Sequence, residues 1–235
     1  STSAVANGHS QIFMSKEQTA SASAGDVKHW VVCFYMPYAN DLSACAGTIF
    51  LQLRQGVSRA AAAIVDARTV SVAVQVKCRG DSLMSRTYLS TCTSMSVATE
   101  HAPGSRDSAN SKTLDAFLCW VKEHTASCDE VGEARAWIVI VLGHGGGPTH
   151  VCPDEDPGEA ADLNELDADG LKWMSIHGVA EAVRRMHQQS CSRVSLLYLQ
   201  NCCKAEASVV YETMGSSDFV LASQPILGAP NNYYA

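Results

Sequence analysis

The sequence predicts an α/β fold in which a central, mostly parallel sheet carries helices on both faces. Nearly continuous apolar runs occur at residues 29–36, 137–142 and 194–199, and such runs are typical of strands buried on both faces of a sheet. Stretches with the helical spacing of apolar residues separate these runs along the chain. This alternation favours parallel strands joined by crossover helices.

The length and charge of the chain exclude several functional classes. Its 235 residues are enough for one large α/β domain or two small ones, and a chain of this size folds without disulfide or metal support. The formal charge is -7 with 17 Lys and Arg, and no basic stripe occurs, so we expect no nucleic-acid partner. No apolar run approaches ~20 residues, so we expect no membrane partner.

The ten cysteines point to a reducing compartment. They form no CxxC pair, and several, such as Cys33 and Cys119, lie in apolar runs where a free thiol packs as a small hydrophobe. The N-terminus lacks the basic start and apolar core of a signal peptide. We therefore expect a cytoplasmic protein, with secretion after removal of a leader as the alternative.

The composition divides the chain into a tail and one domain. Residues 1–27 are rich in Ser, Ala and Gly and indicate a flexible N-terminal tail. Residues 28–235 form the predicted domain. Within it, residues 148–170 read as a long acidic loop, and loops of this length in compact domains are usually functional or disordered.

The first half of the domain begins with the strand at 29–36. Pro37 is expected to close it, because proline cannot donate to a central ladder. Asp41 or Ser43 is expected to cap the next helix, which carries its apolar face to about Gly56.

The middle of the chain continues this alternation. We expect a strand at 70–76, a hairpin within 83–100 and a loop at 102–112. Thr113 is then expected to cap an amphipathic helix that precedes the strand at 137–142.

The last part contains the stretch on which the functional hypothesis depends. We expect helices at 179–186 and 205–212 and a final strand at 219–222. The strand at 194–199 ends in Gln-Asn-Cys-Cys, whose first cysteine is Cys202. The strand at 137–142 ends in Gly-His-Gly-Gly-Gly, whose histidine is His144.

These two strand ends predict a nucleophile beside a base. Ligands bind at the carboxyl edge of open α/β sheets, so neighbouring strands would place His144 next to Cys202 there. Cysteine peptidases need a thiolate, an imidazole and donors for the oxyanion. Cys202 is the candidate nucleophile, His144 the acid and base, and the backbone N–H groups of Gly145 and Cys202 the oxyanion donors. Cys203 competes for the nucleophile role, but neighbouring side chains point to opposite sides.

An ordered set of motifs resembles the clostripain-like cysteine peptidases of the caspase-fold group. These motifs are WVVCFYMPYANDL at 30–42, TLDAFLCW at 113–120, His144-Gly145, QNCCK at 200–204 and LASQPILGAPNNYY at 221–234. The fourth is similar to the family's Asp-Ala-Cys-Leu-Met segment. The resemblance implies a caspase-like three-layer sandwich and a cysteine endopeptidase that acts on protein or peptide substrates.

The long loops indicate how the peptidase is controlled, and the resemblance implies what lines its pocket. Proteolysis in the loops at 101–112 and 148–170, or an activating or regulatory protein, is expected to switch it on. By analogy, Gln200, Ser223 and Gln224 line the first substrate pocket. Gln200 stands where the family has an acidic residue that binds basic side chains of the substrate. The sequence therefore does not predict which substrate residue is preferred before the cleaved bond.

Two alternatives remain beside the peptidase. The first is a non-catalytic caspase-fold module that regulates or scaffolds a partner. The second is a zinc protein that uses His150 and Cys152, although the spacing is poor for such a site. No cofactor is predicted, and calcium is kept as an alternative because Asp167-Ala168-Asp169-Gly170 is similar to the start of a calcium loop.

Overall fold

The computed structural model describes residues 10–14, 29–63, 69–91, 96–102, 106–126, 135–156, 166–189 and 193–228. Eleven strands occur in these ranges, divided between two sheets. They are β1 (Ser10–Met14), β2 (His29–Tyr38), β3 (Thr69–Cys78), β4 (Ser85–Ser90), β5 (Ser96–His101), β6 (Arg135–Leu142), β7 (Gly145–Gly146), β8 (His150–Asp154), β9 (Lys172–Ser175), β10 (Val194–Gln200) and β11 (Phe219–Ser223).

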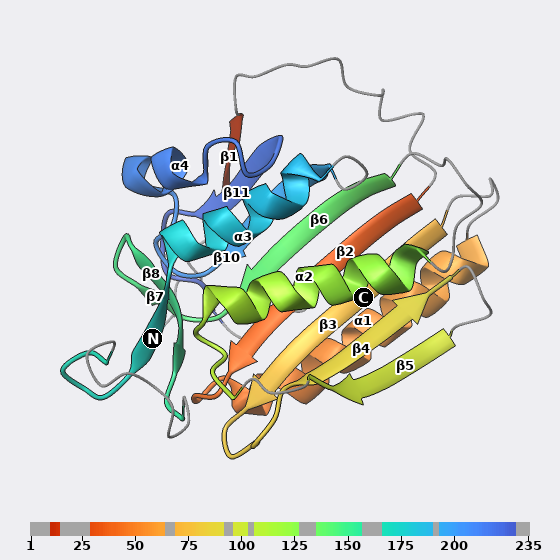
Figure 1. The fold of residues 1–235 in the computed structure, drawn as a ribbon, viewed down its shortest axis with the longest axis horizontal. Coiled ribbons are helices and arrows are strands. Elements are labelled where there is room, and N and C mark those ends of the chain that lie inside the picture. The colour runs from red at the N-terminus through yellow and green to blue at the C-terminus, as the bar shows by residue number, and fades with distance from the viewer. Residues whose placement is uncertain are drawn as a thin grey trace, which may run out of the picture.

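The main sheet has eight strands in the order β1-β11-β10-β6-β2-β3-β4-β5 (Figure 1). Its five central strands, from β11 to β3, run parallel to one another. The edge strands β1, β4 and β5 pair in the antiparallel sense, and β4 with β5 forms the predicted hairpin. The mostly parallel sheet expected from the sequence is therefore confirmed.

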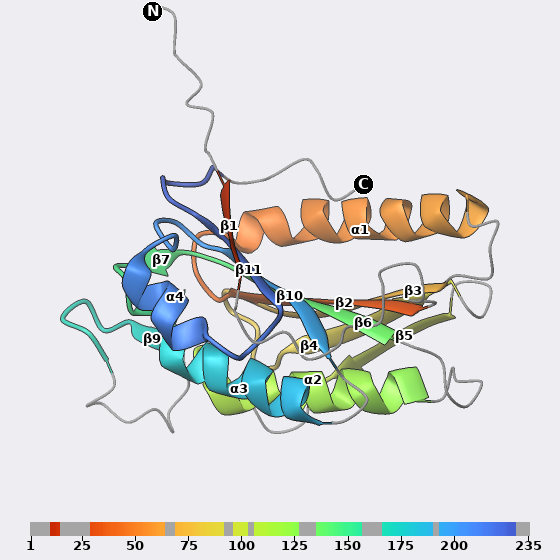
Figure 2. The same ribbon diagram turned by 90° about the horizontal axis from the view of Figure 1, so that it is seen from above.

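Helices cover both faces of this sheet and make a three-layer sandwich (Figure 2). One face carries α1 (Ser43–Ala63). The opposite face carries α2 (Ser111–Ala126), α3 (Ile176–Gln188) and α4 (Ala207–Thr213). This is the layered α/β architecture that the sequence predicts.

Burial on both faces explains why the strands read as continuous apolar runs. In β2, Val31, Cys33 and Tyr35 belong to the core beneath α2 and α3. The alternate residues Phe34 and Met36 belong to the core beneath α1. Since successive side chains of a strand point to opposite faces, both sets of positions must be apolar.

A second, three-stranded sheet, β7-β8-β9, lies at one end of the main sheet and was not predicted. Its strand β8 falls inside the stretch that we expected to be a long acidic loop, residues 148–170, so that expectation is wrong for part of the range. Val151 and Cys152 are fully buried there. Two apolar residues between a histidine and a proline are too short a pattern to indicate a strand.

Part of the predicted N-terminal tail also forms a strand. Ser10–Met14 is β1, and it pairs with β11 at the edge of the main sheet. An edge strand offers unpaired backbone N–H and C=O groups, and pairing with β1 satisfies those of β11 on that side. The rest of residues 1–27 lies outside the described ranges.

Pro37 does not close the first strand as expected. It pairs with Lys77 inside β2, which continues to Tyr38. The pairing of β2 with β6 already ends at Tyr35, so no strand pairs with Pro37 on the β6 side. The missing N–H of proline is tolerated at such an unpaired position.

Two helix starts differ from the sequence-based expectation. Before α1, the Asn40 Oδ1 accepts a hydrogen bond from the Leu42 N–H at 3.0 Å, whereas the Ser43 hydroxyl donates back to the Asn40 carbonyl. Before α2, the Asn110 Oδ1 accepts from the Lys112 N–H at 2.9 Å, and Thr113 lies within the helix. Asparagine therefore takes the place at both starts that was expected for Asp, Ser or Thr. Helix α1 also continues past Gly56 to Ala63.

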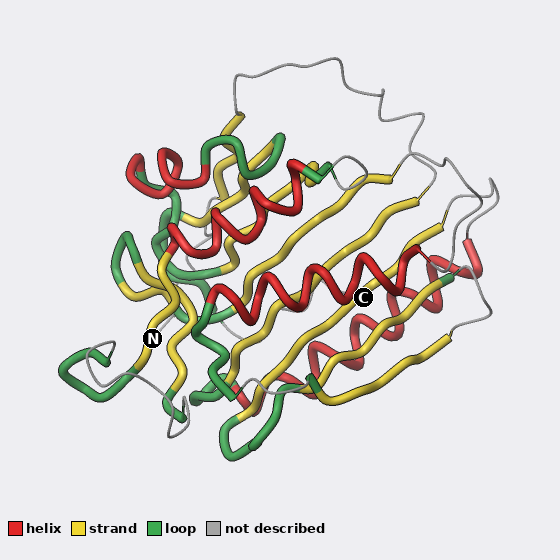
Figure 3. Tube along the Cα trace, in the orientation of Figure 1, coloured by secondary structure: helices red, strands yellow, loops and turns green. Residues whose placement is uncertain are grey.

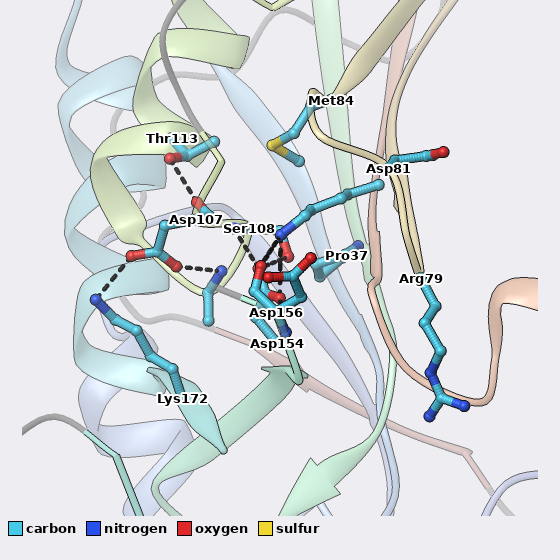
Figure 4. A network of polar contacts seen from close by, with 12 residues as sticks. Pro37, Arg79, Asp81, Met84, Asp107, Ser108, Thr113, Asp154, Asp156 and Lys172 are labelled. Atoms are coloured by element: carbon cyan, nitrogen blue, oxygen red, sulfur yellow. Dashed lines mark hydrogen bonds and ion pairs between the residues drawn. The ribbon is translucent and has the colours of Figure 1, made fainter. Parts of the chain in front are cut away.

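A buried ion pair fastens the second sheet to the main sheet (Figure 4). Lys77 at the end of β3 is 1% exposed, and its Nζ lies 2.9 Å from the Asp154 carboxylate at the end of β8. The same carboxylate accepts hydrogen bonds from the backbone N–H and hydroxyl of Ser108, at 2.8 and 2.6 Å, and Asp154 lies beside Ser108 and Asp156 in the figure. Because every partner is buried and bonded, this network fixes where β8 meets β3.

A further link joins β8 to the turn after β2. The Asn40 side-chain amide donates to the Pro153 carbonyl at 2.9 Å, and the Glu155 N–H donates to the Ala39 carbonyl at 3.0 Å.

None of the helices in the described ranges is long and apolar enough to cross a membrane.

The Lys77→Met substitution should lower the free energy of unfolding by about 3–5 kcal/mol, because it leaves the Asp154 carboxylate buried without its cation. Arg79→Met is the matched control. It breaks an ion pair with Glu155 in which Arg79 is 56% exposed, and it should cost at most about 1 kcal/mol. Urea unfolding of both variants measures the difference, and equal losses would contradict a stabilising role for the buried pair.

Candidate active site

The carboxyl ends of β6 and β10 lie next to each other. The two strands are parallel neighbours, and their last residues, Leu142 and Gln200, face each other in the register. His144 and Cys202 each follow two residues later, in loops that gather at this edge of the sheet (Figure 3). The structure thus brings the two predicted residues to neighbouring strand ends.

Side chains of the cysteine loop hold both ends of the histidine loop. The Asn201 Nδ2 donates to the carbonyls of Gly143 and His144, at 2.9 and 3.3 Å. The Lys204 Nζ donates to the carbonyl of Gly147. We call these contacts the loop clamp, and they fix residues 143–147 against residues 201–204.

Gly145 lies at the closest approach between the two loops. A Cβ atom at this position would lie 2.2 Å from the carbonyl oxygen of Cys202, so only glycine fits without displacing the loop at residues 201–204. The run ends at Gly147 with φ 63, a left-handed conformation that glycine adopts without strain. The glycine-rich sequence is therefore a packing requirement of the site.

The register of the second sheet leaves the Gly145 N–H out of the β7–β8 ladder. Gly145 faces Val151, and the Cys152 N–H donates to the His144 carbonyl at 2.9 Å. In an antiparallel pair this pattern makes Gly145 and Val151 the pair that exchanges no hydrogen bonds. The Gly145 N–H consequently points away from β8, as an oxyanion donor must.

The imidazole of His144 contacts Asp41, which the sequence analysis did not assign to the site. Its Nε2 lies 2.5 Å from the Asp41 Oδ1, in the turn after β2. The hydrogen bond from His144 lowers the pKa of the Asp41 carboxyl below its usual value, and the His144 and Arg79 charges act in the same direction. Asp41 was predicted as a helix cap. Its position just after the end of a central strand could have indicated that it lies at the same edge of the sheet as His144.

The Cys202 thiol contacts a later segment of the chain. Its Sγ accepts a hydrogen bond from the Leu227 N–H at 3.4 Å and lies 3.8 Å from the Leu227 carbonyl. Within the described residues, no hydrogen bond joins this thiol to His144. Residues after β11 thus occupy the space around the thiol.

The other nearby thiols have distinct environments. Cys203 has φ 55 and its N–H donates to the Pro225 carbonyl at 3.2 Å, so its backbone is fixed in a left-handed turn. Cys152 is fully buried, and burial raises the pKa of its thiol to about 12. Such a thiol stays protonated at neutral pH and packs as a small apolar group.

The three predicted pocket residues are not equally accessible. Gln200 is 5% exposed and Ser223 is fully buried, and the Ser223 carbonyl accepts hydrogen bonds from the backbone of Lys204 and Ala205. Gln224 is exposed. Only Gln224 of this set therefore presents its side chain to solvent.

The described residues contain no group of three or more His, Cys, Asp or Glu placed to hold a metal ion. His150 is exposed, whereas Cys152 is fully buried. In the turn similar to a calcium loop, the Asp167 Oδ1 accepts hydrogen bonds from the Asp169 and Leu171 N–H groups, at 3.0 and 2.8 Å. Its Oδ2 accepts from the Trp173 Nε1 at 2.7 Å, so this carboxylate organises the turn itself.

Comparison with solved structures identifies the fold. Two structures of a secreted C11 cysteine protease from Bacteroides thetaiotaomicron match this chain with a TM-score of 0.58 each. One is in complex with an irreversible peptide inhibitor; it is 17% identical, and the match covers 88% of this chain and 52% of that chain. The other, iotapain, is 12% identical, with coverages of 86% and 53%.

The chain therefore has the fold of the C11, or clostripain-like, cysteine proteases, as the sequence motifs indicated. It spans about half the length of the structures that it matches. No family model and no curated protein matches its sequence.

Gly145→Ala should lower the free energy of unfolding by about 1–3 kcal/mol, because the added methyl group overlaps the Cys202 carbonyl. Gly47→Ala is the matched control, since no atom lies within 4 Å of the added group in helix α1. The control should raise stability by about 0.5–1 kcal/mol. If thermal unfolding shows Gly145→Ala to be as stable as the control, the two loops are not in contact.

The Asp41–His144 contact should give stability a dependence on acid pH. Because the folded pKa of Asp41 is lowered, its contribution is present above the unfolded pKa of about 3.9 and is lost as the pH falls through the folded value. The melting-temperature gap between the protein and Asp41→Asn should be largest above about pH 5, narrow as the pH falls below about 4, and vanish below the folded pKa. A gap unchanged down to pH 3 would contradict the contact. We expect a small gap, because Asp41 is 71% exposed.

Proposed function

We propose that this protein is a cysteine endopeptidase in which Cys202 is the nucleophile and His144 the acid and base. The observation that carries the proposal is the pairing of β6 with β10, whose neighbouring ends bear His144 and Cys202 in loops held together by the loop clamp. The shared fold with C11 cysteine proteases supports it.

The Asp41 contact supports the assignment of the His144 Nδ1 as the base. A carboxylate only accepts hydrogen bonds, so the His144 Nε2 next to Asp41 carries the hydrogen. In neutral imidazole the lone pair then lies on Nδ1, which is free to take the thiol proton. Asp41 thereby fixes both the tautomer and the orientation of the ring, as the third group of such a dyad does.

The reaction follows from this arrangement. His144 Nδ1 removes the proton from Cys202, and the thiolate attacks the carbonyl carbon of the peptide bond. The N–H groups of Gly145 and Cys202 stabilise the negative oxygen that forms. When the C–N bond breaks, His144 returns the proton to the leaving amine. A water molecule, activated by the same imidazole, then hydrolyses the thioester and restores the thiol.

Access to the thiol is proposed to be controlled. The Leu227 backbone occupies the position beside Sγ where a substrate backbone would have to lie, so residues 225–228 must move before a peptide binds. Proteolysis or binding of a regulatory protein could supply that change. The predicted cleavage loops at 101–112 and 148–170 lie partly outside the described residues.

The residue preference before the cut is a separate proposal. Gln224 is exposed beyond the end of β11 and is the candidate for contact with the substrate side chain. A panel of peptides that differ only at the residue before the cut measures it. Equal turnover of Arg and Ala peptides would exclude a pocket for basic side chains.

One observation favours the alternative of a non-catalytic module that binds or scaffolds a partner. In the described residues the thiol of Cys202 bonds to Leu227 and not to His144. A module of this kind would keep that arrangement permanently. It would not react with electrophilic peptides.

Labelling with an electrophilic peptide distinguishes the two functions. Cys202→Ala should abolish both labelling and peptide hydrolysis, because it removes the sulfur. His144→Ala should reduce hydrolysis to nearly the same level, and combining the two substitutions should add nothing, since residues that act as one unit are not additive.

Cys203→Ala is the matched control, because it removes the adjacent thiol. It should keep labelling and most of the activity. If Cys203→Ala loses labelling while Cys202→Ala keeps it, Cys203 is the nucleophile. Equal labelling of all three single variants would show that neither thiol is catalytic, and the scaffold function would then be favoured.

A further inference from the structure

Lys204 is a fully buried lysine two residues after Cys202. Its side chain has no exposed surface, and its Nζ donates a hydrogen bond to the Gly147 carbonyl. Burial lowers its pKa, while the charges of Glu206 and of Cys152, Cys203 and Cys202 oppose that change. The ammonium is therefore buried where the loop that carries Cys202 meets the end of the glycine run.

Lys204 differs from the other fully buried lysine, Lys77. Lys77 forms an ion pair with Asp154, which compensates its charge. Within the described residues, Lys204 forms no ion pair, and Gly147 is the only acceptor bonded to its Nζ. An ammonium has three donors, and burying one without a carboxylate is costly. Stability alone would favour an apolar side chain here, such as the Met in the motif that residues 200–204 resemble.

We propose that Lys204 is a positioning residue of the proposed peptidase, which holds the oxyanion-binding loop at residues 145–147 against the nucleophile. The inference rests on the proposed function, since positioning has meaning only for a catalytic loop. Asn201 fixes the start of this loop through Gly143 and His144, and Lys204 fixes its end through Gly147.

The position of the hydrogen bond from Lys204 to Gly147 explains why this bond matters for catalysis. Gly147 has φ 63, and three consecutive glycines restrict the backbone very little. Gly145 and Gly146 pair with β8, whereas Gly147 lies beyond that pairing, and the bond from Lys204 ties it to the nucleophile loop. Without this bond, the Gly145 N–H would be positioned less firmly where negative charge develops.

The effect should appear in the transition state and not in substrate binding. Oxyanion donors act on charge that is absent from the bound substrate, so their loss lowers kcat and leaves KM nearly unchanged. Removing one donor outright lowers kcat by about 10²–10³-fold. Loosening a donor without removing it should cost about 10–100-fold.

Two substitutions in the full chain test this role. Lys204→Met removes both the donor and the charge, whereas Lys204→Gln keeps an N–H donor without the charge. Lys112→Met, at an exposed position of α2, is the control. We would measure kcat and KM with a peptide substrate, the melting temperature, and the rate at which iodoacetamide alkylates Cys202.

Lys204→Met should lose about 10–100-fold in kcat, with KM within about twofold and a melting temperature equal to or above that of the unchanged protein. Alkylation by iodoacetamide should slow far less than kcat falls, because that reaction needs no oxyanion donor. Lys204→Gln should recover part of the lost kcat. A Met variant with unchanged kcat would overturn the proposal. So would a joint loss of melting temperature and kcat in both variants, which indicates a structural role.

Hydrogen exchange separates a failure of this inference from a failure of the proposed function. The amides of residues 145–147 should exchange faster in Lys204→Met than in Lys112→Met, whether or not the protein hydrolyses peptides. Equal exchange in the two variants would overturn the clamp by Lys204. If exchange rises but the unchanged protein neither labels nor hydrolyses peptides, the peptidase function fails, and with it the positioning role.

Discussion

The site depends on one set of contacts, the hydrogen bonds from the loop after β10 to the loop after β6. Asn201 is fully buried, and its amide bonds to two carbonyls of the neighbouring loop, so it fixes the distance between the strand ends. Gly145 can then rest directly on the Cys202 carbonyl. Every chemical role proposed above, whether nucleophile, base or oxyanion donor, requires the two loops to keep this relative position.

The main sheet could be predicted from the sequence because its strands are buried on both faces, and such strands have nearly continuous apolar sequences. The same runs end at polar residues, and this placed His144 and Cys202 at neighbouring strand ends. Asp41, Lys204 and β8 could not be found in that way. Their roles depend on contacts between segments far apart in the chain, such as Asp41 with His144, and a sequence shows the residue type but not its partner.

Lys77 and Lys204, the two fully buried lysines of the described ranges, show two different roles for a buried charge. Lys77 is paired with Asp154, and the carboxylate is further bonded by Ser108, so the second sheet is fixed on the main sheet. Lys204 lacks such a carboxylate in the described residues and bonds to Gly147. A paired buried charge fixes the architecture, whereas a buried charge without a carboxylate partner, in a loop at a strand end, is typical of functional sites. The first arrangement supports β8, and the second supports the loop that β8 holds.

The most direct measurement is a crystal structure of the protein labelled with an electrophilic peptide. We expect a covalent bond between the peptide and the Cys202 sulfur, with the peptide oxygen within about 3.1 Å of the Gly145 nitrogen. We also expect Leu227 to be displaced and the His144 Nδ1 to face the sulfur. A peptide attached to another residue would contradict the central claim. An adduct on Cys202 whose oxygen lies away from Gly145 would contradict it equally.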